Sequence, residues 1–232
     1  MRLKLKRTVD IQQIVWDNRY FIVPSFILFI LILAVVGFHG NDRLFLEINR
    51  LHSSVADFLF LDLTDLGNGV MAFVLVLILL LVSYRESLTF LSLTLILTFL
   101  VRLLKKVIFP GFIRPVLYFG SSSLHLIPGY NPPLLHTFPS GHTVTAFSAC
   151  LFLSFLISKK IWKIFLFLVA IFIGYSRVYV SAHFPFDVVS GAFIAVVITT
   201  LVYYFSRQIH NDWIDKKIQI RLNRTLNSSY DT

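Results

Sequence analysis

Long, uninterrupted runs of apolar residues dominate the pattern along this chain. Six runs are free of charged residues, and they cover positions 20–38, 66–84, 87–101, 143–158, 164–176 and 188–206. A helix needs about 20 residues to cross roughly 30 Å of hydrocarbon. The pattern therefore predicts an all-α, polytopic membrane protein, a bundle of six transmembrane helices over about 20–38, 66–84, 87–104, 143–158, 161–178 and 187–206.

Two of these runs are too short to span a membrane as they stand. The run at 87–101 has 15 residues and the run at 164–176 has 13. Extending them to span length brings Arg102 and Lys105 to the membrane boundary in the first, and Arg177 in the second. Ionisable residues at such depth are costly unless they serve a site or a pathway. We therefore expect a function for them.

The polar segments between the runs differ in character. In the segment 41–65, apolar residues alternate with Glu47 and Arg50 at helical spacing, which is typical of an amphipathic helix in the outer membrane interface. Such a helix could admit a lipid from the side or pack as a lid, and the sequence leaves both open. The segment 109–138 is rich in Pro, Gly and Ser and indicates an outer loop. The tail 207–224 predicts a second interfacial helix.

Composition and charge agree with a membrane protein. The chain is 56% hydrophobic and 14% charged, with a mean hydropathy of +0.77, whereas soluble domains carry about 25% charged residues. The net charge of +9 does not indicate a nucleic-acid partner, because the basic residues gather at the ends of the apolar runs. Fourteen Lys and Arg lie on the face that carries both termini and seven on the other, which predicts cytoplasmic termini. No obligate protein partner can be inferred.

A polar island at 176–187 lies between two apolar runs and holds Arg177, His183 and Asp187. Pro185 stands between the last two, and proline is favoured in the first helical turn. We therefore expect Asp187 one turn inside a helix and His183 just ahead of it. An Asp in that position can hold one ring N–H of the His and leave the other nitrogen as a nucleophile. Arg177 adds a fork-shaped cation suited to phosphate oxygens.

Two earlier segments complement this island. Pro139-Ser140-Gly141-His142 directly precedes an apolar run, so Ser140 is placed as a helix N-cap, and the unpaired N–H groups of a helix start suit a phosphate. Gly141 lets an anion approach the backbone closely. Upstream, two lysines precede Arg114. The sequence contains no Cys/His zinc motif, Walker-type loop or carboxylate cluster, so we expect an anion-transferring site that uses no metal and no cofactor.

These three segments resemble the tripartite signature of the type-2 phosphatidic acid phosphatase and vanadium haloperoxidase superfamily, in its membrane lipid phosphatase branch. The resemblance covers roughly 41–206, with the signature region at about 102–191. It implies three catalytic residues: His183 as nucleophile, Asp187 orienting it, and His142 protonating the leaving oxygen and then activating water. It also implies a set of phosphate-binding residues, which are Lys106, Arg114, Ser140, Gly141 and Arg177. Seven residues separate Lys106 from Arg114, one more than the family pattern, so Lys105 is the alternate to Lys106.

The resemblance also implies a function. We expect an integral membrane lipid phosphatase of a bacterial inner membrane, which removes a terminal phosphate at the outer face through a phosphohistidine. Polyprenyl pyrophosphate such as undecaprenyl pyrophosphate, phosphatidylglycerophosphate, phosphatidic acid and lipid A phosphates all fit, and we favour the first two. The alternative is a non-catalytic membrane protein that binds lipid headgroups. Haloperoxidase chemistry with bound vanadate fits less well, because those relatives are soluble proteins.

Overall fold

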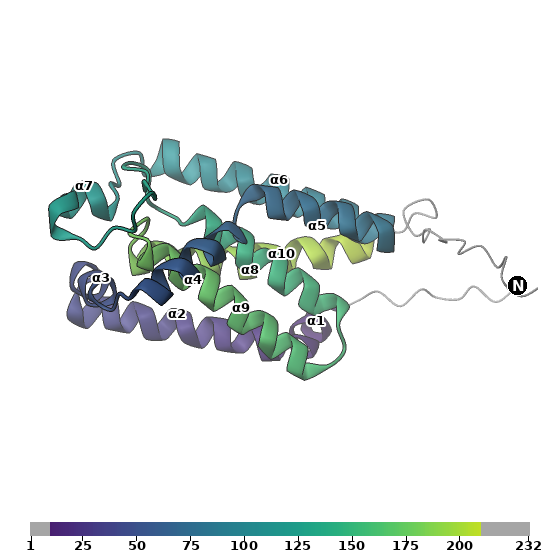
Figure 1. Ribbon diagram of the computed structural model, residues 1–232. Helices are drawn as coiled ribbons and strands as arrows, with labels where there is room; N and C mark the ends of the chain where they lie inside the picture. Colours follow the sequence, from purple (N-terminus) through teal and green to yellow (C-terminus); the bar gives the residue numbers. More distant parts are fainter. Residues whose placement is uncertain (1–9, 210–232) are drawn as a thin grey trace, which may run out of the picture.

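The described chain, residues 10–209 of a computed structural model, is a bundle of helices (Figure 1). The α-helices are α1 (Ile11–Asp17), α2 (Arg19–His39), α3 (Asn41–Arg50), α4 (Ser54–Asp65), α5 (Gly69–Val82), α6 (Tyr84–Leu103), α7 (Pro115–Phe119), α8 (Gly141–Leu156), α9 (Lys160–Tyr179) and α10 (Pro185–Gln208). A π-helical turn, η1 (Leu104–Ile108), extends α6, and a 3-10 turn, η2 (Ser121–Ser123), follows α7. The prediction of an all-α fold is confirmed for these residues.

Within the described residues, four helices are long and apolar enough to cross a membrane: α2, α6 with η1, α9 and α10. A fifth candidate is the pair α4 and α5, which is bent by 54° at its break, and α8 is a shorter apolar helix. Residues 10–209 thus contain four candidate spans, or five with the bent pair, and the six predicted spans are not all confirmed. The α5 helix begins at Gly69, three residues after the start of the predicted span at 66–84, and follows α4 after a short break. Most of the predicted tail helix lies outside the described residues.

The two short apolar runs extend through charged residues, as predicted. The span formed by α6 and η1 runs from Tyr84 to Ile108 and includes Arg102 and Lys105. The α9 helix includes Arg177 in its last turn. Both extensions carry cations to the same end of the bundle.

The segment predicted as one amphipathic helix forms two. Ser53 ends the break between them and caps α4 by accepting a hydrogen bond from the Ala56 N–H at 3.2 Å. On α3, Phe45 is fully buried and its ring centroid lies 5.6 Å from that of Phe119 and 5.4 Å from that of Phe184. The apolar side of α3 thus packs on the protein beside the polar island, which favours the packing lid over the lateral lipid gate.

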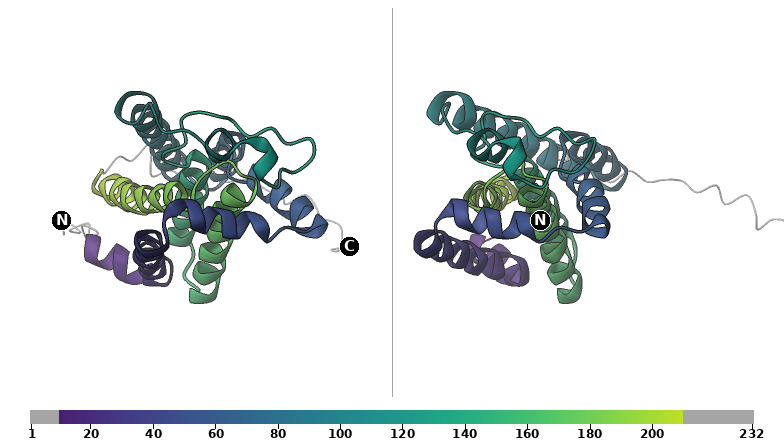
Figure 2. Two further views of the ribbon diagram at one scale, coloured as in Figure 1. Left: turned by 90° about the vertical axis from the view of Figure 1, so that its left-hand side faces the viewer. Right: turned by 60° about the vertical axis from the view of Figure 1, so that its left-hand side comes forward.

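The core of the bundle lies around α8, which packs between α9 and α10 and is surrounded by the long helices in the end-on view of Figure 2. Phe147, Leu151 and Phe152 of α8 are fully buried. The outer helices instead turn large apolar side chains outward, for example Ile30 and Phe99, which are 62% and 70% exposed. Exposed apolar surface on this scale is typical of helices that face lipid rather than water.

Polar contacts join the helices at the end of the bundle opposite the polar island. Lys163 is buried in α9, and its Nζ donates to the Asp17 carbonyl at 2.9 Å and to Asn18 Oδ1 at 2.7 Å. Arg207 of α10 pairs with Glu86 of α6 at 2.6 Å. These contacts connect α9 to the α1–α2 junction and α10 to α6.

Candidate active site

The three polar segments meet at one end of the bundle, the left-hand end in Figure 1. The backbone N–H of Ser140 donates to the carbonyl of Asp187 at 3.0 Å. Arg114 Nη1 donates to the Ala182 carbonyl at 2.8 Å, and its Nε donates to the Leu135 carbonyl at 2.9 Å. Hydrogen bonds to backbone carbonyls therefore fix the relative positions of segments that lie far apart in the sequence.

The polar island folds as predicted from its proline. A tight turn follows α9, in which the N–H groups of Ala182 and His183 both donate to the Arg177 carbonyl at 3.1 Å. Pro185 then occupies the first turn of α10. Asp187 lies one turn inside that helix, and its Oδ2 accepts the Phe184 N–H at 2.9 Å. The carboxylate is therefore held at the helix start, directed toward His183.

The two ring nitrogens of His183 have different partners. Nε2 lies 3.2 Å from Arg114 Nη1, and Nδ1 lies 3.2 Å from Thr137 Oγ1. A guanidinium has only donors, so Nε2 must accept and Nδ1 must carry the proton. Thr137 accepts that proton and donates its own hydroxyl to Asp187 Oδ2. The structure thus assigns the ring lone pair to Nε2, where it accepts from Arg114.

Asp187 contacts His183 less directly than the sequence predicted. The distance from His183 Nδ1 to Asp187 Oδ2 is 3.6 Å, and the Thr137 hydroxyl hydrogen-bonds to both groups. Thr137 is 1% exposed, and sequence reasoning missed it. The signal available was weak: a hydroxyl residue three positions before Ser140, in a loop rich in other polar residues.

Burial and charge keep the His183 ring neutral. The residue is 1% exposed. This burial and the nearby charges of Arg114, Lys105 and Arg177 hold the pKa of His183 well below its usual value. Burial, together with the charge of Arg177, also lowers the pKa of Arg114, to about 10, so the guanidinium remains charged at neutral pH. The site therefore combines a neutral imidazole with fixed cations.

Arg177 is a buried cation with one unused donor. It is 3% exposed, Nη2 donates to the Tyr130 hydroxyl at 3.1 Å, and Nη1 donates to Thr64 Oγ1. Its Nε has no hydrogen-bond partner within the described part of the chain. Sequence reasoning missed Thr64 and Tyr130 as partners. A buried guanidinium with an open N–H is well suited to an anion.

Lys105, and not Lys106, contacts the loop beside His183. Lys105 Nζ donates to the carbonyls of His136 at 2.8 Å and Thr137 at 3.5 Å, in the loop that contacts His183. Lys106 is exposed. Consecutive helical residues point about 100° apart, so only one of the two can face the site. The spacing to Arg114 favoured Lys106, whereas the π-helical turn η1 at the end of α6 turns Lys105 toward the loop, so the alternate lysine becomes our proposal for phosphate binding.

The segment at 139–142 forms the start of α8, as predicted. Ser140 caps the helix, and its Oγ accepts from the Thr143 N–H at 3.4 Å and from Thr143 Oγ1 at 2.8 Å. His142 is half-buried, and its ring makes no hydrogen bond within residues 10–209. Lys105, Arg114 and Arg177 interact electrostatically with both His142 and His183, so the two imidazoles share one cationic environment.

Two glycines lie where neighbouring helices contact the backbone of the 139–142 segment, and sequence reasoning missed both. A Cβ at Gly191 of α10 would lie 2.8 Å from the Ser140 carbonyl oxygen. A Cβ at Gly67, in the α4–α5 break, would lie 2.9 Å from the His142 carbonyl oxygen. Neighbouring helices can therefore pack directly on the backbone of the 139–142 segment.

The family model of the PAP2 superfamily matches residues 86–210, more than half of the sequence, and the match contains all three segments. The chain belongs to the PAP2 superfamily. Its helical bundle and its apolar outer surface agree with a membrane member of this superfamily. Among residues 10–209, no group of three His, Cys, Asp or Glu side chains is placed to hold a metal ion.

Two solved structures resemble a large part of the bundle. LpxE from Aquifex aeolicus has a TM-score of 0.62 and 31% sequence identity, over 69% of this chain and 92% of that chain. A transmembrane PAP2-type phosphatidylglycerolphosphate phosphatase from Bacillus subtilis has a TM-score of 0.56 over 83% of this chain and 99% of that chain. Its sequence identity is 22%, so this likeness concerns the fold alone.

Curated relatives match over shorter stretches. A bacitracin transport permease protein, BcrC, from Bacillus licheniformis is 37% identical over 82 residues, which is 34% of this chain and 39% of that protein. A lipid A 4'-phosphatase from Bacteroides thetaiotaomicron is 35% identical over 72 residues, 31% of this chain and 32% of that protein. The matched stretches thus cover about a third of each relative.

Proposed function

We propose that this PAP2 protein is an integral membrane phosphatase that removes the terminal phosphate from a lipid phosphate or pyrophosphate, with His183 as the nucleophile. The observation that carries the proposal is the state of the His183 ring. Nδ1 is tied through Thr137 to Asp187, while Nε2 keeps its lone pair beside the Arg114 guanidinium. A neutral imidazole aimed into a group of cations is suited to attack a phosphorus atom.

The reaction has two steps. In the first, His183 Nε2 attacks the terminal phosphorus, the bond from phosphorus to the lipid oxygen breaks, and its electron pair stays on that oxygen, which takes a proton from His142. In the second, water gives a proton to His142 and attacks the phosphohistidine. The P–N bond then breaks and inorganic phosphate leaves. In the structure, Nε2 contacts Arg114. When substrate binds, the guanidinium must therefore leave Nε2 and contact a phosphoryl oxygen instead.

The remaining cations hold the phosphoryl oxygens. Lys105, Arg114 and Arg177 supply positive charge where the transition state gathers negative charge. The start of α8 supplies the N–H groups of Gly141 and His142, the first two of that helix, while Ser140 positions them as the N-cap. This division of roles needs no metal ion, and we propose that the enzyme works without one.

The names of the relatives support a lipid phosphate as substrate. One similar protein is a lipid A 4'-phosphatase and one similar fold is that of a phosphatidylglycerolphosphate phosphatase. We propose the same substrate class here, together with the arrangement predicted from charge: cytoplasmic termini, and the site at the outer leaflet of a bacterial inner membrane.

Phosphate release by the purified, detergent-solubilised protein tests this proposal. The panel is undecaprenyl pyrophosphate, phosphatidylglycerophosphate, phosphatidic acid and a lipid A phosphate, each with and without a chelator. We expect wild type to cleave at least one of them in chelator, Lys106→Ala to match it, and His183→Ala to be inactive. Absence of turnover on the whole panel, combined with tight vanadate binding, would instead identify a headgroup-binding protein. A strict divalent-metal requirement would contradict the mechanism.

A further inference from the structure

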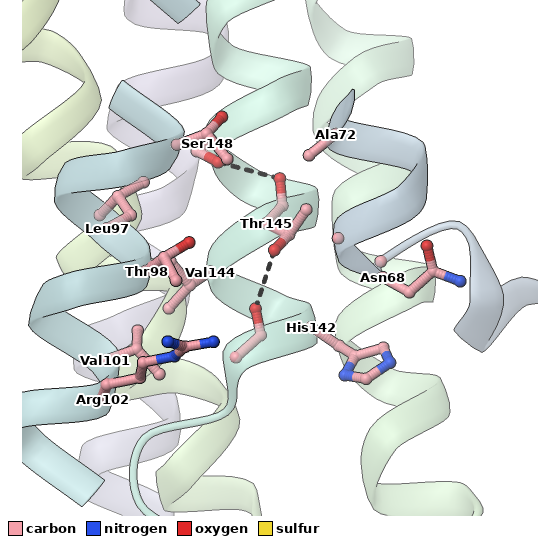
Figure 3. Close-up of a pocket in the computed structure, with 14 residues that line it drawn as sticks. Asn68, Ala72, Leu97, Thr98, Val101, Arg102, His142, Val144, Thr145 and Ser148 are labelled. Atoms are coloured by element: carbon pink, nitrogen blue, oxygen red, sulfur yellow. Dashed lines mark hydrogen bonds between the residues drawn. The ribbon is translucent and has the colours of Figure 1, made fainter. Parts of the chain in front are cut away.

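The cavity in Figure 3 is lined by His142 and adjoins the candidate active site. A second and larger cavity, of about 710 Å³, lies at the opposite end of the bundle, the right-hand end in Figure 1, where α1 ends and α2 and α9 begin. It is lined by α1 and the start of α2, by the end of α8 and the start of α9, and by Tyr203 of α10. We call it the α1–α9 cavity. None of the residues that line it takes part in the proposed reaction.

A buried cation lines this cavity. Lys163 is 4% exposed, and its two hydrogen bonds go to uncharged acceptors, the Asp17 carbonyl and Asn18 Oδ1. A lysine ammonium has three N–H donors, so one donor has no partner among residues 10–209. The Asp17 carboxylate accepts instead from Gln13 Nε2 at 2.9 Å. A buried charge that no carboxylate neutralises is costly, so an anion in the cavity would stabilise Lys163.

Two further cations line the α1–α9 cavity. Arg19 Nη1 donates to the Trp16 carbonyl at 2.7 Å, and Nη2 donates to the Tyr20 hydroxyl at 3.1 Å. A guanidinium has five N–H donors, so others remain open within the described part of the chain. Lys160 is exposed and makes no hydrogen bond or ion pair with residues 10–209. With Lys163, the cavity has three cations against one carboxylate, and it is therefore complementary to an anion.

An apolar groove adjoins the cavity. It has a volume of about 490 Å³, lies between α2 and α9, and shares Arg19 and Tyr20 with the cavity. We call it the α2–α9 groove. Its other walls are apolar residues of the two helices: Val23, Pro24, Ile164, Phe167 and Leu168. A cationic cavity joined to an apolar groove offers one site for a phosphate group and another for a hydrocarbon chain.

Two exposed tryptophans indicate where this end of the bundle meets the membrane surface. Trp16 of α1 is 63% exposed, and the Arg19 guanidinium carbon lies 4.3 Å from its ring centroid. Trp162 of α9, next to Lys163 in the sequence, is 52% exposed. Tryptophan is enriched at membrane–water interfaces. We therefore expect the cavity at the level of the lipid headgroups and the groove at the level of the acyl chains.

We propose that the α1–α9 cavity and the α2–α9 groove bind one anionic phospholipid, in the leaflet opposite the candidate active site. Its phosphate contacts Lys163, Arg19 and Lys160, and one acyl chain lies in the groove. Basic pockets between transmembrane helices suit such headgroups. Lys163 also joins α9 to the junction of α1 and α2, so the bound lipid stabilises the packing of these helices. The site is separate from the proposed reaction and does not depend on which substrate is cleaved.

The test measures the binding of dioleoyl phosphatidylglycerol to the purified protein in neutral detergent, by native mass spectrometry and by the rise in melting temperature. We expect wild type to bind it more tightly than dioleoyl phosphatidylcholine, which has the same chains and no net charge. Lys163→Gln should lose roughly tenfold to a hundredfold in affinity, the effect of a hydrogen bond to a charged group. Lys160→Gln, a substitution at an exposed position, should lose up to about fivefold.

Two variants are matched controls. Lys159→Gln removes an exposed cation beside Lys160 that does not line the cavity, and Lys105→Gln removes a cation from the candidate active site. Both should keep the wild-type affinity for phosphatidylglycerol. If Lys163→Gln does not fold, the comparison of Lys160→Gln with Lys159→Gln decides, because both positions are exposed.

Three outcomes would overturn this inference and leave the proposed function standing. The first is equal affinity of wild type for the two lipids. The second is a Lys160→Gln protein that binds phosphatidylglycerol as Lys159→Gln does, or a loss of affinity in Lys105→Gln, which would place the lipid in the active site. The third is displacement of phosphatidylglycerol by an equimolar amount of inorganic phosphate, which would identify a site for a free anion without a chain.

Discussion

At His183 a single hydroxyl, that of Thr137, holds the proton on Nδ1 and leaves Nε2 as the proposed nucleophile. Thr137 accepts from Nδ1 and donates to Asp187, so it transmits the orienting effect of the carboxylate to the ring. Thr137→Val keeps the shape and removes both hydrogen bonds. We expect kcat to fall roughly tenfold to a hundredfold, the size found when a partner that orients a functional histidine is removed. Thr137→Ser keeps the hydroxyl and should retain most of the activity; equal activity in Val and Ser variants would contradict the bridging role.

The charge of Arg114 should be visible in the pH dependence. Arg114 helps to hold the pKa of His183 low, which keeps the imidazole neutral into acidic solution. Arg114→Met removes a positive neighbour, so protonation of His183 becomes easier and its pKa rises. The acidic limb of the kcat/KM profile of Arg114→Met should therefore move to higher pH. The maximum of kcat/KM should also fall. Arg114→Lys keeps the charge and should leave the limb near its wild-type position.

If the acidic limb of Arg114→Met stays in place or moves to lower pH, Arg114 does not hold the pKa of His183 low. The maximum alone does not discriminate, because Arg114 is also proposed to bind the phosphoryl oxygens. The position of the limb is the informative quantity, since it reports the protonation of an essential group in the free enzyme.

How far the sequence predicts individual residues depends on how local their geometry is. The placement of His183 and Asp187 followed from Pro185 and helix spacing, and Ser140 was recognised as an N-cap. The choice between Lys105 and Lys106 depended on the π-helical turn after α6, and the role of Thr137 depends on a loop brought in from elsewhere. Such contacts between distant segments leave no periodic signal in the sequence.

At the scale of elements, glycines determine how closely the helices approach the 139–142 segment. Gly191→Ala would place a Cβ 2.8 Å from the Ser140 carbonyl oxygen, so α10 or the loop must move. We expect a loss of about 1–3 kcal/mol of stability, as for other overpacked sites, and a loss of activity. Melting temperature and kcat in detergent measure both effects.

Gly37→Ala is the matched control for that experiment. Gly37 lies within α2, and a Cβ there would meet nothing within 4 Å. Its replacement by Ala should leave activity unchanged and be neutral or stabilising by roughly 0.5–1 kcal/mol, because Ala favours the helix. If Gly191→Ala behaved like Gly37→Ala, close packing of α10 on the Ser140 backbone would not be needed.

The sequence predicts the long helices well and the short ones less well. The apolar runs at 20–38 and 188–206 form the helices α2 and α10, and the helices of the two short runs extend through the charged residues at their ends. The prediction separated 41–65 from 66–84, whereas α4 and α5 form a pair bent by 54°, with Gly67 packed against the backbone at His142 in the break. Hydropathy reports the solvent that a segment prefers and not the angle at which two helices meet.

At the scale of the whole molecule, the distribution of Lys and Arg predicts which ends of the helices face the cytoplasm. The sequence has one cysteine, Cys150, which is buried and can be replaced by Ala. In that background, Ser122→Cys places a thiol in the loop near the site, and Ser158→Cys places one between α8 and α9. A membrane-impermeant maleimide applied to intact bacterial cells should label the first and reach the second only after permeabilisation. The reverse pattern would place the site in the cytoplasm.

The central claim is that His183 carries the phosphoryl group between the two steps, and trapping that intermediate tests it most directly. Purified protein is mixed with the best lipid substrate of the panel, quenched in alkali within the first turnover, digested and analysed by mass spectrometry. The account predicts a phosphoryl group on His183 that is stable in alkali and lost in acid, and none in His183→Ala. A phosphoryl group trapped on another residue, or turnover by His183→Ala, would contradict it.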